Sequence, residues 1–302
     1  MATVPETPQI PETPKVPREA KDTDQAGDSD QAKGRTGRNL PVAIGVGVGL
    51  GGLVILTLFT VKATFLAYVG VAIAIALVEL TTALAKRDIN IPVIPVAAGG
   101  AAIITCAYWL GPQAALAALG LTVIAIFAWR LPSGAVGYVK DTTAGVFAVA
   151  YLPFLASFVA AMLVPADGPR RVLSFVILTI SSDIGGYFAG ITMGRHKMAP
   201  LISPKKTWEG FAGSAAACLI AGWLCVTYLL HGHPWQGVLT GAAVVLAATL
   251  GDLVESMIKR DLDIKDMGTL LPGHGGVLER LDSLLAAAPV VWLLLYLFLP
   301  GR

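Results

Sequence analysis

Residues 63–85 read ATFLAYVGVAIAIALVELTTALA, a run in which the only charged side chain is Glu79. The hydrocarbon core of a bilayer is about 30 Å thick, and a helix of roughly 20 apolar residues spans it. The run therefore predicts a transmembrane helix. Its single acid lies near Lys86 and is interpreted as a packing or snorkelling residue, outside any functional site.

Runs of the same kind fill the chain beyond residue 40. Hydrophobic residues make up 55% of the 302 residues and charged residues 14%, with a mean hydropathy of +0.70. Soluble domains carry roughly 25% charged residues, so the composition excludes an ordinary soluble enzyme. We expect an all-α, polytopic integral membrane protein of about nine transmembrane helices, with eight or ten as alternatives. The nine runs are 41–61, 63–85, 93–110, 113–129, 142–164, 171–190, 211–230, 236–256 and 283–299.

The first 40 residues differ from the rest of the chain. They hold 13 of the 42 charged residues and two Pro-Glu-Thr-Pro repeats, at 5–8 and 11–14, with almost no apolar surface. We expect a disordered cytoplasmic tail at 1–40, followed by one membrane domain over 41–302. The tail does not resemble a signal peptide, because the first apolar run starts only at Pro41.

The basic residues indicate the orientation, since Lys and Arg are retained on the cytoplasmic side of a membrane. With the N-terminus inside, 18 of the 22 basic residues fall in cytoplasmic segments. The distribution predicts a multi-pass protein of the cell membrane with a cytoplasmic N-terminus. Topology alone explains these cations, so we expect no nucleic-acid partner.

The other charges concentrate in residues 251–282, which hold 11 of them, seven being carboxylates. Topology does not require these acids, because acidic residues contribute little to orientation. Asp252, Ser256 and Lys259 are four and three residues apart, and so share one face of a helix. This spacing predicts a polar site at the end of the helix.

The glycines around His274 and the acids that follow them extend this site. Gly273, Gly275 and Gly276 would let the backbone approach an anionic ligand closely and point N–H groups at it. Glu279 and Asp282 are three residues apart at the start of the last run, where they could hold a divalent cation between them.

A second polar segment, Ser203-Pro-Lys-Lys-Thr-Trp-Glu-Gly210, directly precedes an apolar run. Adjacent lysines, a hydroxyl and a helix N-terminus together predict a phosphate cradle. In the preceding run, Asp183 and Tyr187 lie four residues apart on one helix face. They either face a polar cavity or form a hydrogen bond between helices.

Residues 256–283, SMIKRDLDIKDMGTLLPGHGGVLERLDS, resemble the signature of bacterial phosphatidate cytidylyltransferases, the CDP-diacylglycerol synthases. That pattern is Ser-x-x-Lys-Arg-x4-Lys-Asp, then Pro-Gly-His-Gly-Gly, then Asp-Arg-x-Asp. The segments 251–256 and 203–210 are also typical of the family, so the resemblance covers about residues 180–285. It implies that these residues are the catalytic part of a transmembrane cytidylyltransferase domain over 41–302. The sequence departs from the family pattern at one position, where it has Glu279 and the family usually has Asp.

The resemblance implies that CTP and phosphatidate from the inner leaflet give CDP-diacylglycerol and pyrophosphate, with Mg²⁺ required, in phospholipid biosynthesis. The lipid phosphate would attack the α-phosphorus of CTP on the cytoplasmic face. Since the reacting groups are anions, catalysis depends on positioning and charge neutralisation, to which a site of one or two metal ions can contribute. A homodimer is a possible working unit.

Three sets of site residues follow from the resemblance and from the chemistry of the side chains. The predicted metal ligands are Asp252, Asp266, Glu279 and Asp282. The predicted catalytic residues are Ser256, Lys259, Arg260, Lys265, Asp266, His274, Arg280 and Asp282. The predicted substrate-binding residues are Asp183, Tyr187, Ser203, Lys205, Lys206, Thr207, Gly273, Gly275 and Gly276.

Two other functions stay open on the sequence. One is a related CTP-dependent enzyme acting on another lipid, such as a polyprenol kinase or a CDP-archaeol-type synthase. The other is a secondary transporter, which is less favoured because the chain has no internal repeat and its polar cluster lies at one membrane face.

Overall fold

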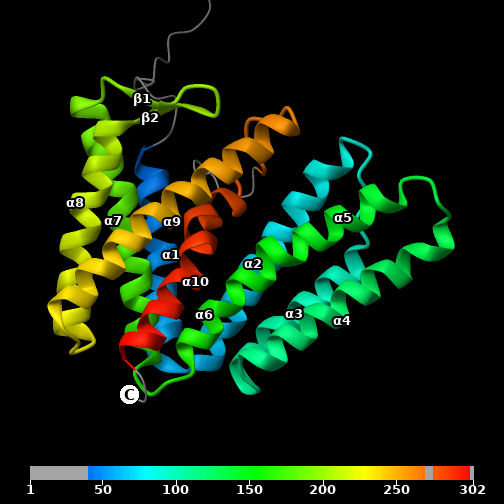
Figure 1. The fold of residues 1–302 in the computed structure, drawn as a ribbon, viewed down its shortest axis with the longest axis horizontal. Coiled ribbons are helices and arrows are strands. Elements are labelled where there is room, and N and C mark those ends of the chain that lie inside the picture. The colour runs from blue at the N-terminus through cyan, green and yellow to red at the C-terminus, as the bar shows by residue number, and fades with distance from the viewer. Residues whose placement is uncertain (1–39, 269–274, 300–302) are drawn as a thin grey trace, which may run out of the picture. The chain divides into compact units, whose positions relative to one another are not determined.

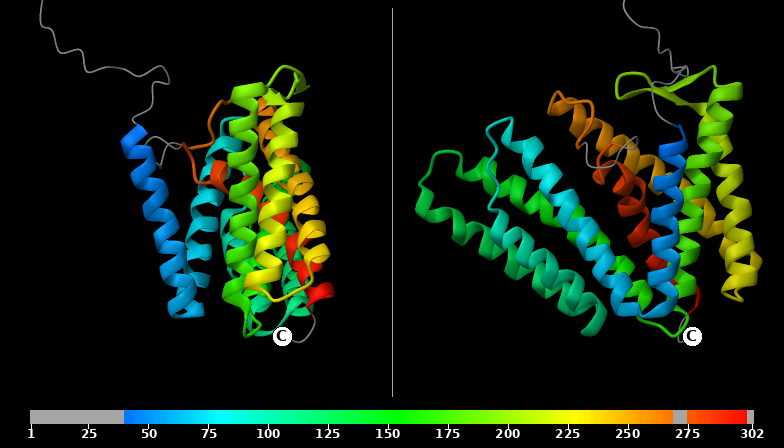
Figure 2. Two further views of the ribbon diagram at one scale, coloured as in Figure 1. Left: turned by 90° about the vertical axis from the view of Figure 1, so that its left-hand side faces the viewer. Right: turned by 180° about the vertical axis from the view of Figure 1, so that it is seen from behind.

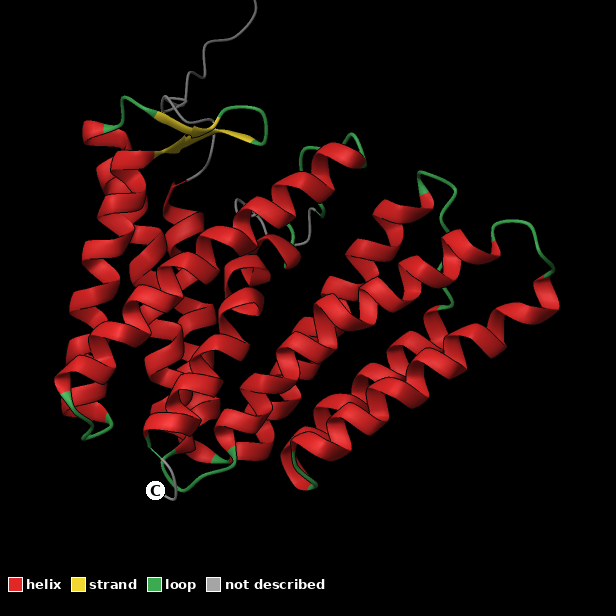
Figure 3. Cartoon of the chain, in the orientation of Figure 1, coloured by secondary structure: helices red, strands yellow, loops and turns green. Residues whose placement is uncertain are grey.

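The computed structural model describes residues 40–268 and 275–299, and this part of the chain is almost entirely helical (Figures 1 and 3). The helices are α1 (Leu40–Thr60), α2 (Lys62–Ala85), α3 (Val93–Trp109), α4 (Pro112–Arg130), α5 (Tyr138–Val149), α6 (Leu155–Leu163), α7 (Gly168–Met193), α8 (Trp208–Leu224), α9 (Pro234–Asp261) and α10 (Leu278–Phe298). Short helical turns extend or join them: η1 (Leu131–Ser133), η2 (Ala150–Phe154) and η3 (Cys225–Leu229).

Each of the nine predicted runs is helical, because η2 joins α5 and α6 into one continuous segment. The turn η2 is π-helical, and Pro153 lies inside it, where the wider turn tolerates the missing N–H. In the described part of the chain, seven helical segments are long and apolar enough to cross a membrane. The stretches 49–60 and 93–109 are shorter apolar helices. A polytopic membrane architecture is thereby confirmed, and the count of nine spans stays a prediction.

A small antiparallel hairpin between α7 and α8 was not expected from the sequence. It consists of β1 (Lys197–Ala199) and β2 (Ser203–Thr207), with Lys197 opposite Thr207. The hairpin lies beyond the ends of α7 and α8 (Figure 1). The predicted phosphate cradle is therefore an extended strand that leads into α8.

The helix ends meet in two groups that alternate along the chain. One group joins the segments predicted to be cytoplasmic, through Lys140 Nζ to Arg87 O (2.9 Å), Asn90 N to Asp141 Oδ1 (2.8 Å), Arg87 Nε to Leu262 O (3.0 Å) and Arg260 Nε to Ile202 O. The other joins the segments predicted to lie outside, through Lys62 Nζ to Val164 O (3.1 Å) and Arg171 Nη2 to Leu299 O (2.9 Å). The alternation agrees with the predicted topology.

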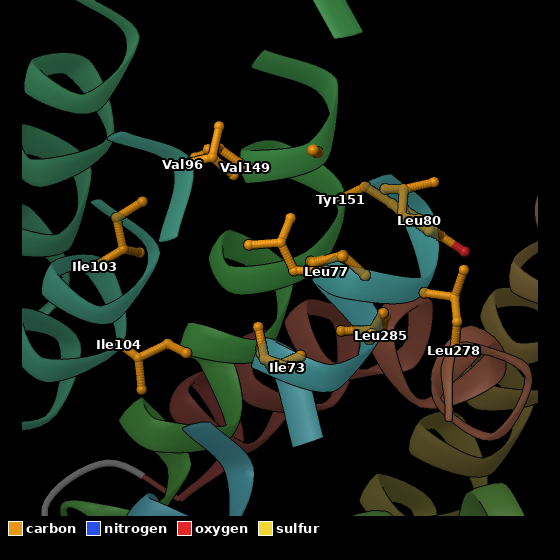
Figure 4. Packing of buried hydrophobic residues seen from close by; sticks show 14 of the residues in the cluster. Ile73, Leu77, Leu80, Val96, Ile103, Ile104, Val149, Tyr151, Leu278 and Leu285 are labelled. Carbon is orange, nitrogen blue, oxygen red and sulfur yellow. The ribbon is translucent and has the colours of Figure 1, made fainter. Parts of the chain in front are cut away.

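Two clusters of buried apolar side chains form the core, and α2 contributes to both. One cluster centres on α2 to α6, and the other on α6 to α10. Leu262, Met267 and Leu278, which border the loop between α9 and α10, belong to the first cluster. Figure 4 shows Leu80 of α2 and Leu278 of α10 in the same packed region. The described residues on both sides of this loop are thus packed against the N-terminal helices.

The last four helices approach one another through glycines. The helices α7 and α8 run side by side, as Figures 1 and 2 show from three directions. A Cβ on Gly185 would lie 2.6 Å from Gly213 O, and one on Gly251 would overlap Asp282 O of α10. Only glycine fits at such contacts. Gly251 brings α10 close to α9 beside Asp252 and Asp282, two of the predicted site residues.

Candidate active site

A cavity of about 340 Å³ opens between α7, α8, α9 and β2. Gly186 and Gly190 of α7 belong to its lining, and a Cβ on Gly186 would overlap Ser214 Oγ of α8. The lining contains six predicted substrate-binding residues and one predicted metal ligand. These are Asp183, Tyr187, Ser203, Lys205, Lys206, Thr207 and Asp252. The structure thus brings together the segment predicted as a phosphate cradle and the helix face that carries Asp183 and Tyr187.

A second cavity, of about 540 Å³, lies between β2 and the C-terminal end of α9. Its cations are Lys205, Lys259, Arg260 and Lys265, and Asp263 is the one acid among the described residues that line it. The predicted catalytic residue Ser256 lines it too. Such an excess of positive charge suits a ligand with several negative charges.

The two cavities are adjacent, because Ser203 and Lys205 of β2 line both. The strand therefore lies between a compartment lined by acids and lysines and a compartment dominated by cations. Lys205 can therefore contact a ligand bound in either cavity.

Local hydrogen bonds explain the shape of the hairpin. Thr207 caps α8, its Oγ1 accepting from Gly210 N at 3.1 Å. Glu209, in the first turn of α8, accepts from Arg195 N at 3.1 Å and pairs with His196 Nδ1 at 2.6 Å. These bonds fasten the start of the hairpin to the start of α8.

Two longer contacts tie the hairpin to α9. Lys206 Nζ forms an ion pair with Asp252 Oδ2, and Arg260 Nε donates to Ile202 O. The contacts lie about two turns apart on α9. They explain why β2 forms a wall of both cavities.

Three carboxylates from three helices face one common region. Asp183 of α7, Asp252 of α9 and Asp282 of α10 lie within electrostatic range of one another. The cations Lys206 and Arg280 also lie within electrostatic range of Asp183. The three carboxylates outnumber these two cations, and the excess of negative charge favours a bound cation.

Unsatisfied oxygen atoms border the same region. Among the described residues, the buried Glu255 Oε1 and Tyr151 Oη have no hydrogen-bond partner, and both lie within electrostatic range of Asp252. Buried polar atoms without a partner are rare. In the described residues, however, no three acidic, His or Cys side chains are already closed around one point as a metal site.

Glu279 is engaged by the backbone around it. Its carboxylate accepts from Met267 N at 3.3 Å and from Gly276 N at 3.2 Å, and it contacts Lys259 Nζ at 3.3 Å. Lys259 also pairs with Glu255, at 2.7 Å. The predicted metal ligand Glu279 thus holds the two flanks of the loop before α10 together.

The remaining predicted residues are placed as follows. Lys265 and Asp266 are exposed, and only Lys265 lines one of the two cavities. Gly275 has a φ of +83°, which favours glycine, and a Cβ there would overlap the carboxylate of Glu279. The predicted residues Gly273 and His274 lie outside the described residues.

Glu79 was interpreted from the sequence as lying outside any functional site, but the structure connects it to the segments that carry the predicted site. Glu79 of α2 accepts hydrogen bonds from Val277 N at 3.0 Å and Leu278 N at 2.9 Å. Its partners are backbone groups almost 200 residues away, so no local pattern reveals them. The available signal was a lone carboxylate in an apolar span, which is costly unless it has a partner.

Comparison with known proteins identifies the family. Residues 41–298 match the Cytidylyltransferase family. The chain is 41% identical over 279 residues to the phosphatidate cytidylyltransferase of Mycobacterium leprae (strain TN), covering 87% of this chain and 89% of the relative. It is 42% identical over 277 residues to that of Mycobacterium tuberculosis (strain ATCC 25618 / H37Rv), covering 87% and 84%. It is 40% identical over 145 residues to that of Brucella suis biovar 1 (strain 1330), covering 46% and 54%. The match to the family includes every helix described above, and the chain belongs to the cytidylyltransferase family.

Proposed function

We propose that this protein is a phosphatidate cytidylyltransferase of the cell membrane, which converts CTP and phosphatidate into CDP-diacylglycerol and pyrophosphate for phospholipid biosynthesis. The observation that carries the proposal is the pair of adjacent cavities on either side of β2. One is dominated by cations and the other contains carboxylates, and Lys205 lines both. Membership in the family and the names of the mycobacterial relatives support it.

The reaction joins two anions, so charge neutralisation is the main requirement. An oxygen of the lipid phosphate forms a bond to the α-phosphorus of CTP, while the bond from that phosphorus to the β-bridging oxygen breaks and pyrophosphate leaves. Lys259, Arg260 and Lys265 neutralise the β- and γ-phosphates in the second cavity. Lys205, shared by both cavities, stabilises the charge on the transferred group.

The donor groups fit a hard divalent cation. Mg²⁺ prefers carboxylate oxygens together with substrate phosphates. Asp252 and Asp282 approach each other where α9 and α10 meet, and the unpartnered Glu255 Oε1 and Tyr151 Oη lie beside them. We assign Asp252 and Asp282 as ligands and Glu279 to the backbone of the loop. When bound, Mg²⁺ would neutralise charge on the phosphate oxygens.

Phosphatidate enters the first cavity sideways from the inner leaflet. On α7, Ile184, Tyr187, Phe188 and Ile191 are all more than 60% exposed, and Tyr187 also lines the cavity. An apolar face of this kind suits acyl chains, while Lys205 and Lys206 attract the headgroup. The active site then lies on the cytoplasmic face, in keeping with the excess of Lys and Arg at that end of the helices.

The test uses the purified full-length protein in detergent micelles with labelled CTP and phosphatidate. We expect labelled CDP-diacylglycerol and pyrophosphate with MgCl₂, and no product with EDTA. Parallel reactions replace phosphatidate with a polyprenol or with an archaeal-type ether lipid phosphate. Faster labelling of either lipid, or no product from phosphatidate, would contradict the proposal.

A further inference from the structure

Glu79 caps a helix to which it does not belong. Its side chain is 8% exposed, and its two oxygens accept from Val277 N and Leu278 N. These N–H groups begin α10, whose own N-cap residue, Val277, has no side chain that accepts a hydrogen bond. The first N–H groups of a helix need partners, and a negative charge is favourable there. Glu79 therefore supplies from α2 the cap that α10 lacks.

The backbone on both sides of residues 269–274 converges on this carboxylate. A Cβ on Gly268 would overlap Glu79 Oε1, and a Cβ on Gly276 would lie 2.7 Å from Glu79 Oε2. A residue with a side chain fits at neither position unless the carboxylate moves. Just after α2 ends at Ala85, Arg87 Nε donates to Leu262 O at 3.0 Å, just after α9. The C-terminal half of α2 and the turn that follows it thus contact the end of α9, Gly268 and the start of α10.

The segments held in this way carry the predicted site. Lys265 lies just before Gly268, and α10 carries Glu279 and Asp282 within its first two turns. We infer that Glu79 is a positioning residue for the cytidylyl transfer, because it fixes α10 against the segment that follows α9. The inference rests on the proposed function, and it adds to the site a residue of the N-terminal helices.

The variant Glu79→Gln tests the capping hydrogen bonds separately from the volume of the side chain. The amide keeps the size of the carboxylate, but its Nε2 is a donor and meets an N–H group where an acceptor is needed. One N–H at the start of α10 then loses its partner and the charge disappears. Loss of a buried hydrogen bond to a charged group corresponds to about a tenfold change or more in an equilibrium.

The matched control is Asp141→Asn, a change from buried carboxylate to amide at the same end of the helices. Asp141 is 3% exposed, accepts from Asn90 N at 2.8 Å and pairs with Arg130 at 2.9 Å, and it lines neither cavity. We expect Asp141→Asn to lower the thermal unfolding midpoint about as much as Glu79→Gln does. It should do so without releasing the start of α10.

We therefore measure kcat, KM for CTP, thermal unfolding and amide hydrogen exchange for Glu79→Gln and Asp141→Asn in the full chain. Glu79→Gln is expected to lower kcat/KM for CTP by about tenfold or more and to speed exchange in residues 275–282. Asp141→Asn is expected to lower the unfolding midpoint only. Wild-type kinetics and exchange in Glu79→Gln, or equal losses in both variants, would overturn the inference.

A double-mutant cycle tests the contact directly. Gly268→Ala should displace the carboxylate and so reproduce the kinetic loss of Glu79→Ala. The double variant should be no worse than Glu79→Ala alone, because the space for the new methyl group is then free. Losses that multiply would show that the two residues act independently and would overturn the inference. If the wild type makes no CDP-diacylglycerol, the proposed function fails, whereas exchange in residues 275–282 still decides whether Glu79 caps α10.

Discussion

The N-terminal helices, α1 to α6, and the C-terminal helices, α7 to α10, treat buried charge differently. In the first group the buried carboxylates Glu79 and Asp141 accept hydrogen bonds from backbone N–H groups. In the second group Glu279 accepts from backbone N–H groups in the same way, but Asp183, Asp252 and Asp282 lie within electrostatic range of one another. The first arrangement satisfies the charge within the protein and fixes helix ends. The second leaves carboxylate oxygens available to a ligand.

The two groups of helices also differ in how closely their backbones pack. A Cβ on Gly120 of α4 would meet nothing within 4 Å, whereas one on Gly251 of α9 would overlap the backbone of α10. Close backbone contact holds the C-terminal helices at fixed distances, which a site built from several helices requires. Substitutions in both groups of helices, each with a matched control, test this difference.

The largest effect is expected at the facing carboxylates. Asp282→Asn removes a charge that we assign to metal binding, and kcat should fall about 10³-fold, as is typical when a charge-stabilising group is lost in phosphoryl transfer. The control in the N-terminal helices is Asp88→Asn, at an exposed position with φ of +56° that asparagine tolerates. Initial rates at saturating substrates measure both. An Asp282→Asn variant with the wild-type rate would refute the metal assignment.

The next effect is expected at the lysine that both cavities share. Lys205→Met should raise KM for CTP and for phosphatidate by roughly tenfold or more each, the size of a lost charge-assisted hydrogen bond. Lys197→Met, at an exposed position in the same hairpin that lines neither cavity, should leave both KM values unchanged. If Lys205→Met changes KM for only one substrate, Lys205 binds that substrate alone, although it lines both cavities.

A smaller effect is expected where α9 touches α10. Gly251→Ala forces the two helices apart and should cost about 1–3 kcal/mol, the usual range for overpacking. The thermal unfolding midpoint in detergent should fall, and kcat should fall with it because Asp252 and Asp282 separate. Unchanged stability together with unchanged kcat would show that the contact does not set the spacing of the carboxylates.

The smallest effect is expected at the open glycine of the N-terminal helices. Gly120→Ala adds a methyl group in free space and should raise stability by no more than about 1 kcal/mol, through helix propensity. The unfolding midpoint should rise slightly or stay constant, and kcat should not change. A clear loss of stability would show that α4 packs against a partner at this position.

The helical architecture could be predicted from the sequence because it depends on local composition. The nine apolar runs became nine helical segments, whereas the orientation inferred from the basic residues stays a prediction. The β1–β2 hairpin was missed, since its five-residue strand Ser-Pro-Lys-Lys-Thr has no alternating apolar pattern. Its conformation comes from Lys206 and Thr207, which bond to α9 and to the start of α8.

Individual site residues could be proposed where side chains of matching chemistry lie in short segments. Lys205, Lys206 and Asp183 were each predicted to bind substrate, and the structure places them around one cavity, while their role stays a prediction. The role of Glu79 was not predictable, because its partners are main-chain N–H groups, which every residue except proline possesses. Sequence identity carries no information about which backbone groups a carboxylate will reach.

The cap at the start of α10 also sets an order of events during synthesis. Val277 lies 198 residues after Glu79, so at 5–20 residues per second the ribosome needs roughly 10–40 s to make the partner of a carboxylate that is already in place. During that interval α2 carries a charge without its final hydrogen bonds. The N–H groups that satisfy it belong to α10, which is made only after α3 to α9, so the contact between α2 and α10 forms late in synthesis.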